Sequence, residues 1–62
     1  MKLRVFYPWE RTPVGGYFFV PTLTPERTRE EGLRVALYVN CRGRGTPGVL
    51  HKRFGVLFQR TH

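Results

Sequence analysis

The chain has 62 residues, with eleven Lys or Arg against four Asp or Glu, for a net charge of +7. This length predicts one small domain over residues 1–62. The single cysteine excludes an intrachain disulfide, and one cysteine with two histidines cannot complete a four-ligand zinc site without an acid or a second chain. No apolar run approaches the roughly 18 residues of a membrane span. We therefore expect a cytoplasmic protein with no membrane partner, metal or cofactor.

The first third of the chain predicts two strands joined by a loop. Residues 2–7 alternate between two faces and are rich in β-branched and aromatic side chains, which predicts a strand. Residues 8–16 hold two prolines and two glycines and predict a loop. A short aromatic strand is expected over 17–20, where Pro21 stops it.

All four residues of this second strand are large. Alternation places Phe18 and Val20 on one face and Tyr17 and Phe19 on the other. A domain of this size cannot cover both faces by itself. We therefore expect either a homo-oligomer or a visible apolar patch.

A helix is predicted to begin at Pro25. Thr24 can cap it, proline fits the first helical position, and Glu26 lies at the positive end of the helix dipole. Because the residues that follow are good helix formers, we expect one helix over 25–38.

Gly32 leaves an alternative open. It is either a glycine in the middle of the helix or the residue that ends a two-turn helix. In the second case, the alternating apolar residues that follow form a strand. The alternative is a short helix over 25–31 followed by a strand over 33–40, within a five-stranded sheet.

The remainder predicts a loop over 40–48 and then a hairpin, with strands over 49–52 and 56–60 and a turn near 53–55. The fold class is α+β: a small, mostly antiparallel sheet with one helix, in the order ββαββ. The residues expected to supply much of the core are Leu3, Val5, Phe18, Val20, Leu33, Leu37, Val49, Val56 and Phe58.

The basic charge is concentrated near the end of the chain, since residues 41–62 carry five Lys or Arg and no acid. Arg42 and Arg44 alternate with glycines, which allow close approach of a ligand. Lys52 and Arg53 fall at the predicted hairpin turn. If the loop and the turn meet at one end of the sheet, the four cations converge on a phosphate-binding patch.

Aromatic residues add a second signal. Tyr17 and Phe19 are candidates for stacking on bases. Trp9, in a loop rich in proline and glycine, is a candidate for stacking or for an interface anchor. The sequence thus predicts a non-catalytic accessory or regulatory protein that binds a polyanion, above all nucleic acid. The alternative is an adaptor or inhibitor, of the kind that phages and mobile elements encode, docking on an acidic surface of a larger protein.

Catalysis has little support in the sequence. Three of the four acids lie on the predicted helix among its arginines, as on a solvated face. A nucleophile and base would have to come from Cys41 with His51 or His62. We therefore predict no catalytic residues and no enzymatic activity.

Overall fold

The computed structural model describes residues 6–62. Its elements, in chain order, are β1 (Tyr17–Pro21), α1 (Pro25–Tyr38), β2 (Gly43–Leu50) and β3 (Arg53–Arg60). The predicted α+β class is confirmed, but the order is βαββ and the described residues form three strands. The predicted strand over 2–7 lies mostly outside the described residues, and residues 6 and 7 are not in a strand.

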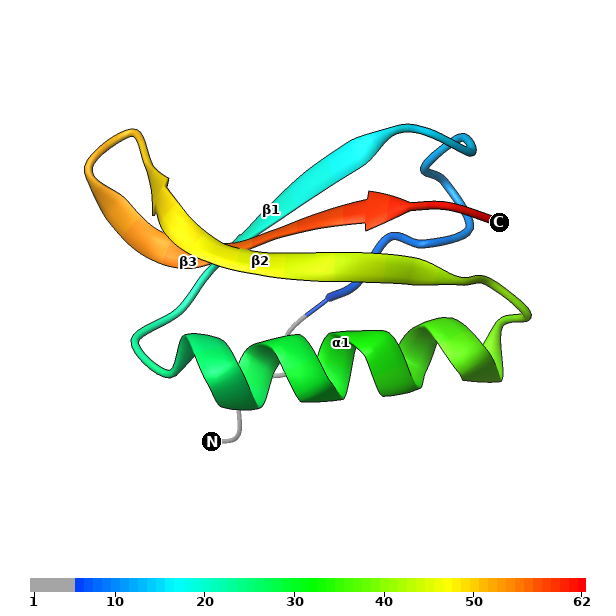
Figure 1. The fold of residues 1–62 in the computed structure, drawn as a ribbon, viewed down its shortest axis with the longest axis horizontal. Coiled ribbons are helices and arrows are strands. Elements are labelled where there is room, and N and C mark those ends of the chain that lie inside the picture. The colour runs from blue at the N-terminus through cyan, green and yellow to red at the C-terminus, as the bar shows by residue number, and fades with distance from the viewer. Residues whose placement is uncertain (1–5) are drawn as a thin grey trace.

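The three strands form one sheet in the order β1-β3-β2 (Figure 1). Both outer strands are antiparallel to β3, so β1 and β2 run parallel to each other. Because parallel strands cannot be joined by a tight turn, α1 makes the crossover between them. The last strand of the chain is therefore the central strand of the sheet.

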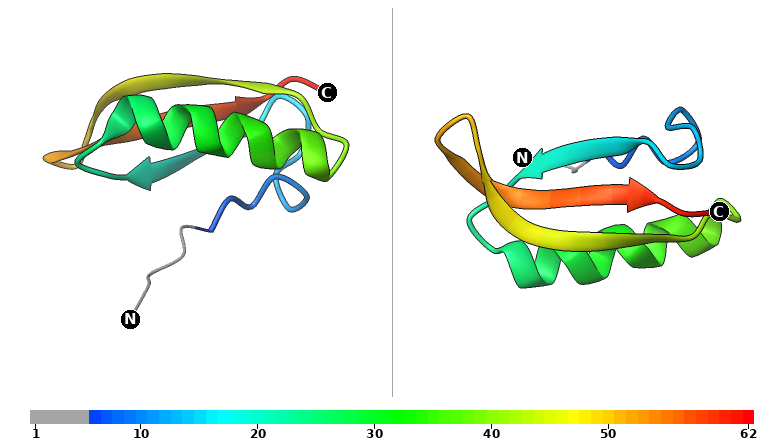
Figure 2. Two further views of the ribbon diagram at one scale, coloured as in Figure 1. Left: turned by 90° about the horizontal axis from the view of Figure 1, so that it is seen from below. Right: turned by 45° about the horizontal axis from the view of Figure 1, so that its top comes forward.

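The helix lies on one face of the sheet, under β2 and β3, and no described segment covers the other face (Figure 2). The segment that precedes β1 inserts Tyr7 and Trp9 on the helix side. No helix among residues 6–62 has the length and apolarity to cross a membrane. The domain thus has one packed face and one open face.

The helix runs over 25–38 as predicted, and the alternative with a strand over 33–40 is wrong. Pro25 opens the helix, but the Thr24 side chain makes no capping hydrogen bond. Thr22 instead links the end of β1 to the start of the helix, because its hydroxyl oxygen accepts hydrogen bonds from the Thr24 amide (3.1 Å) and the Thr28 hydroxyl (2.9 Å).

Gly32 stays inside the helix because the sheet approaches it closely. A Cβ at this position would overlap the rings of Phe58 and Tyr7. The main-chain oxygen of Gly32 also accepts a hydrogen bond of 2.9 Å from the indole nitrogen of Trp9. The glycine therefore costs helix propensity and in return permits close packing of the helix on the core.

Four aromatic rings form the centre of the core, and Phe58 touches the other three. Phe18 stacks on it at 5.2 Å between ring centroids, whereas Trp9 and Tyr7 meet it edge-on at 5.6 and 5.8 Å. Trp9 also meets Phe18 edge-on at 4.9 Å. Offset and edge-to-face pairs are the favourable geometries for such rings.

The core predicted from the sequence was partly right. Val20, Val56 and Phe58 are buried, and Phe18 and Leu33 pack against them. Leu37 and Val49 are largely exposed, because the first lies on the outer side of α1 and the second lies near the tip of the hairpin. Leu3 and Val5 lie outside the described residues. The prediction missed Tyr7, Trp9, Ala36 and Cys41, all of which are buried.

The prediction of a loop over 40–48 was wrong, because most of that segment belongs to β2. Side chains from other elements occupy the space over its glycines: Trp9 lies against Gly43, and Phe58 lies against Gly45. The hairpin turn is formed by His51 and Lys52, with φ angles of 50° and 63°, and not by residues 53–55. Two successive residues with positive φ are what a two-residue hairpin turn of type I′ requires.

Replacing Gly32 by Ala tests the close packing of α1. The added methyl group overlaps Phe58, and overpacking costs about 1–3 kcal/mol, against a helix-propensity gain of about 1 kcal/mol. We expect the free energy of unfolding, measured by urea denaturation, to fall by up to about 2 kcal/mol. Gly48→Ala is the matched control, because a Cβ there meets no atom within 4 Å. A stabilised Gly32→Ala protein would contradict the packing described above.

The hydroxyl group of Tyr7 is buried and has no hydrogen-bond partner among the described residues. Burial raises the pKa of this hydroxyl above its ordinary value of 10.0, and the Glu31 carboxylate adds to the rise. The folded state therefore holds the proton more tightly than the unfolded state does. This contribution to stability is complete below pH 10 and is lost as the pH rises above it.

Tyr7→Phe removes the unpartnered hydroxyl and keeps the ring. A buried polar group without a partner costs about 1–3 kcal/mol, so we expect the variant to be as stable as the wild type at pH 7, or more stable. We also expect the loss of stability between pH 10 and 11 to be smaller than in the wild type, as measured by urea denaturation at each pH. Tyr38→Phe, on the exposed side of the helix, should keep the wild-type profile. A marked loss of stability in Tyr7→Phe at pH 7 would mean that the hydroxyl is hydrogen-bonded.

Candidate nucleic-acid interface

The uncovered side of the sheet carries two rows of side chains that the strand register aligns. Tyr17 pairs with Gln59, which pairs on its other side with Arg44. In the next row, Leu57 stands between Phe19 and Thr46. Because side chains alternate along a strand, all six lie on the same side of the sheet, away from α1. We call this surface the open face, and its members are Tyr17, Phe19, Arg44, Thr46, Leu57 and Gln59.

The two aromatic residues of the open face come from β1, as the alternation of that strand predicted. Tyr17 has 60% of its surface exposed, and Phe19 is half-buried. The ring of Phe19 lies over Gly55, where a Cβ would overlap it. Gly55 therefore provides the space in which the Phe19 ring rests on the sheet, while the ring of Tyr17 is available to a ligand.

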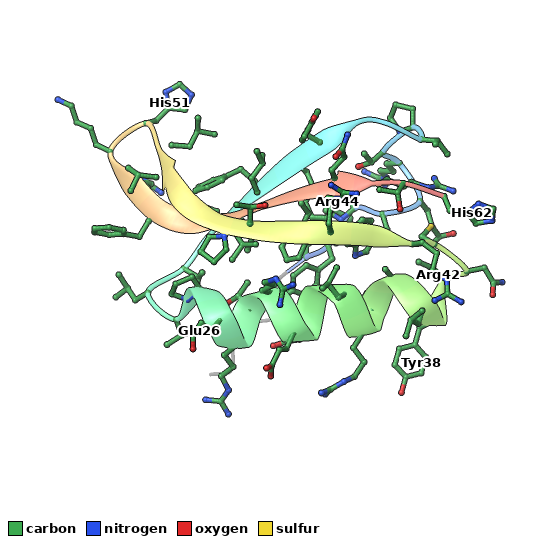
Figure 3. The ribbon with its side chains drawn as sticks, viewed as in Figure 1. Glu26, Tyr38, Arg42, Arg44, His51 and His62 are labelled. Carbon is green, nitrogen blue, oxygen red and sulfur yellow. The ribbon has the colours of Figure 1, made fainter. Side chains whose placement is uncertain are left out.

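The four predicted cations do not converge. Figure 3 shows Arg44 over the middle of the sheet and Arg42 at one end, with His51 of the turn at the opposite end. Lys52 belongs to that turn, and Arg53 follows it. At about 3.3 Å per residue, β2 separates Arg44 from the turn by about 20 Å. The cations are thus spread along the sheet.

Two other arginines hold the fold together. Arg60 donates hydrogen bonds to the main-chain oxygens of Thr12 (2.9 Å) and Trp9 (3.2 Å). Arg29 of the helix donates one of 2.7 Å to the main-chain oxygen of Gly45 in β2. Charge counting along the sequence cannot separate these structural arginines from those available to a ligand.

Trp9 does not lie at the surface. Its side chain is fully buried among Phe18 and Phe58, and its indole nitrogen is bonded to the helix. The structure therefore gives Trp9 a role in the core, and the prediction of an exposed stacking or anchoring residue fails for it. The sequence offered no local signal for this, because a tryptophan between prolines in a loop suits either position.

The acidic side chains of the domain lie outside its strands, and on α1 three arginines balance the three glutamates. Three of its four acids, Glu26, Glu30 and Glu31, belong to α1, and Glu10 belongs to the loop before β1. β2 and β3 contain arginines, and none of the three strands contains an acid. An anionic ligand on the open face would therefore meet only cations on the strands, which is the arrangement that steers polyanions.

The other chemistry-bearing residues are dispersed or buried. Among residues 6–62, no three His, Cys, Asp or Glu side chains lie close enough together to hold a metal ion. Cys41 is buried, and its thiol lies 3.5 Å from the main-chain oxygen of Val39. His51 stands in the hairpin turn, far from His62 (Figure 3).

A second exposed surface lies at the hairpin end of the domain and was not predicted. Leu23 has 91% of its surface exposed and Phe54 has 66%. Both line a shallow groove together with Lys52 and Arg53. We call this surface the hairpin end. Val49 and Leu50, which precede the turn, are exposed beside it.

In comparisons with known proteins, the chain matches no family model, no curated protein and no solved structure. The functional proposal below therefore depends on the geometry and charge of the surfaces just described.

Two alanine substitutions test the division between structural and available arginines. Arg60→Ala removes three hydrogen bonds from a charged donor to main-chain oxygens, two to the loop before β1 and an exposed one to His62, and buried bonds of this kind contribute about 1.5–3 kcal/mol each. We expect a loss of at least about 1.5 kcal/mol in the free energy of unfolding. Arg44→Ala, at an exposed strand position, should change it by less than about 0.5 kcal/mol. Equal losses in thermal or urea denaturation would contradict this division.

Proposed function

We propose that the protein is a non-catalytic, accessory or regulatory nucleic-acid-binding protein, and that its open face holds a single strand. The observation that carries this proposal is the row of Tyr17, Gln59 and Arg44 across a sheet whose strands hold no acid. An aromatic ring, an amide and a guanidinium lie side by side there on three adjacent strands. These are the groups that recognise, respectively, the face of a base, its edge and a phosphate.

Each group has a defined task in this proposal. The exposed ring of Tyr17 stacks on a base, and every base presents a suitable face. Phe19 extends the apolar surface beside it. Gln59 offers both a donor and an acceptor to a base edge. Arg44 contacts a phosphate, with Arg53 placed farther along the same side of β3 as a second contact.

A single strand suits the open face better than a duplex does. Stacking on an aromatic side chain requires a base that is not already stacked in a helix. The faces of bases in a duplex are covered by their neighbours, so a duplex could use only the cations of this surface. We therefore expect single-stranded DNA or RNA to bind more tightly than duplex DNA of the same sequence.

Tyr17→Ala tests the stacking role. Loss of one stacked base is worth about 1–3 kcal/mol, so we expect the Kd for a fluorescein-labelled oligo(dT) or oligo(U) to rise by roughly 5- to 150-fold. Fluorescence anisotropy at low salt measures it. The matched control is Tyr38→Ala, since Tyr38 is 82% exposed and points away from the sheet, below α1 (Figure 3). Equal effects of the two substitutions would remove the open face as the site.

The salt dependence of nucleic-acid affinity measures how many phosphate contacts the cations of the open face make. Each phosphate contact on a single strand contributes about 0.7 to the slope of log affinity against log salt. Arg44→Ala should lower the magnitude of the slope by about that amount for every base sequence. Arg34→Ala changes the net charge equally but lies on the helix, and it should leave the slope close to that of the wild type.

The hairpin end supports a second candidate function, docking on an acidic surface of a larger protein. Leu23 and Phe54 supply exposed apolar contacts, and Lys52 and Arg53 supply charge beside them. This combination of apolar and cationic groups is frequent at protein interfaces. Wild-type protein that binds neither DNA nor RNA at low salt would overturn the first proposal and favour this one. A pulldown from host lysate with and without nuclease then distinguishes direct protein partners from those held by nucleic acid.

A further inference from the structure

The outer edge of β1 presents main-chain groups that no segment within residues 6–62 pairs with. Two hydrogen bonds at the ends of β1 show which of its residues face β3. The Arg60 amide donates to the main-chain oxygen of Gly16 (3.0 Å), and the Thr22 amide donates to the main-chain oxygen of Phe54 (2.9 Å). Residues of an antiparallel edge strand alternate between bonding the neighbouring strand and facing outward. Phe18 and Val20 therefore bond β3. The main-chain groups of Tyr17, Phe19 and Pro21 face outward.

The opposite edge of the sheet is protected. The amide of Thr61 donates to the main-chain oxygen of Arg42 (2.8 Å), so Arg42 and every second residue after it bond β3. The main-chain groups of the residues between them, which include Gly45 and Pro47, face outward. Arg29 already occupies the oxygen of Gly45, and Pro47 has no N–H to donate. An incoming strand would find one acceptor taken and one donor missing on this side.

The β1 edge is less protected among the described residues: no side chain occupies its outward main-chain oxygens, and its only missing donor is at Pro21, the last residue of the strand. Its five residues, YFFVP, carry no charge, and its pairing with β3 contains no bulge. No segment within residues 6–62 pairs with its outer side, and Figure 1 shows β1 at the border of the sheet. Proteins usually protect such edges with charged residues, prolines or bulges, because an open edge recruits another strand.

We propose that a second copy of the chain covers this edge, with the two β1 strands antiparallel and a two-fold axis at Phe19. In this register, the amide and oxygen of Phe19 bond those of Phe19 in the second copy. The amide of Tyr17 reaches the oxygen of Pro21 in the second copy, and the symmetric bond forms as well. The two outward N–H groups of β1, those of Tyr17 and Phe19, both have an acceptor in this register. Pro21, which has no N–H, contributes only its main-chain oxygen as an acceptor. A two-fold interface needs this self-complementarity.

The dimer has a six-stranded sheet whose two open faces are continuous. The Phe19 rings of the two copies become direct cross-strand neighbours, which is a favourable aromatic pair. Each copy carries a charge of +7, so mutual repulsion opposes association and added salt relieves it. The interface uses main-chain groups and is independent of nucleic-acid binding, which added salt weakens.

Sedimentation equilibrium without nucleic acid, from 10 µM to 1 mM protein, tests the proposal. We expect a monomer–dimer equilibrium that is tighter in 0.5 M than in 0.05 M NaCl. Tyr17→Pro removes an outward N–H that β3 does not use and should weaken the dimer at least roughly tenfold, because two symmetric hydrogen bonds are lost. Tyr17→Ala keeps the N–H and is the matched control, expected to dimerise within a few-fold of the wild type.

Amide hydrogen exchange of the wild type provides a second measurement that needs no variant. The amides of Tyr17 and Phe19 should become more protected as the protein concentration rises, whereas that of Gly45 on the other edge should not. A monomer at 1 mM in 0.5 M NaCl, or a dimer in which these two amides stay unprotected, would overturn the proposal. So would a Tyr17→Pro protein that dimerises as strongly as the wild type.

Discussion

The contact between Phe58 and the main chain of Gly32 is the constraint on which the rest of the domain depends. It brings α1 so close to the sheet that the indole nitrogen of Trp9 can reach the oxygen of Gly32. Trp9 and Tyr7 then fill the space beside the helix, and Phe18 closes the cluster from β1. A 62-residue domain has only a few kcal/mol of stability, so one such cluster decides whether the sheet has a covered face.

The helix could be predicted to its last residue because its signals are local. Pro25 and Glu26 mark its start, and its propensities outweigh one glycine. The strand β2 could not be predicted, since a segment of glycine and proline is typical of a loop. Its glycines at 43 and 45 are explained only by rings from distant parts of the chain, and Pro47 is tolerated because its missing N–H faces the outer edge. Packing and strand position, which a single sequence does not display, overrode composition.

The candidate site divides in the same way. Alternation within β1 correctly separated Tyr17 and Phe19 from the core side of the strand. That Arg44 shares their face depends on β2 being a strand and on β3 lying between the two, and neither could be read from spacing. The burial of Trp9 could not be predicted either, because it depends on a space that other elements of the fold enclose. Residue types indicated that aromatic and cationic side chains were available for binding. The order of the strands decided that Tyr17 and Arg44 lie on the same face.

The position of β3 has a consequence for the making of the protein. Within residues 6–62, β1 and β2 pair only with β3, so this sheet cannot form until residues 53–60 are present. A nascent chain that ends at β2 has a helix, two unpaired strands and several exposed aromatic rings. Such a chain can form neither the sheet nor the aromatic cluster, because both need β3 and its Phe58. During synthesis, assembly of the sheet and core of residues 6–62 therefore waits for β3.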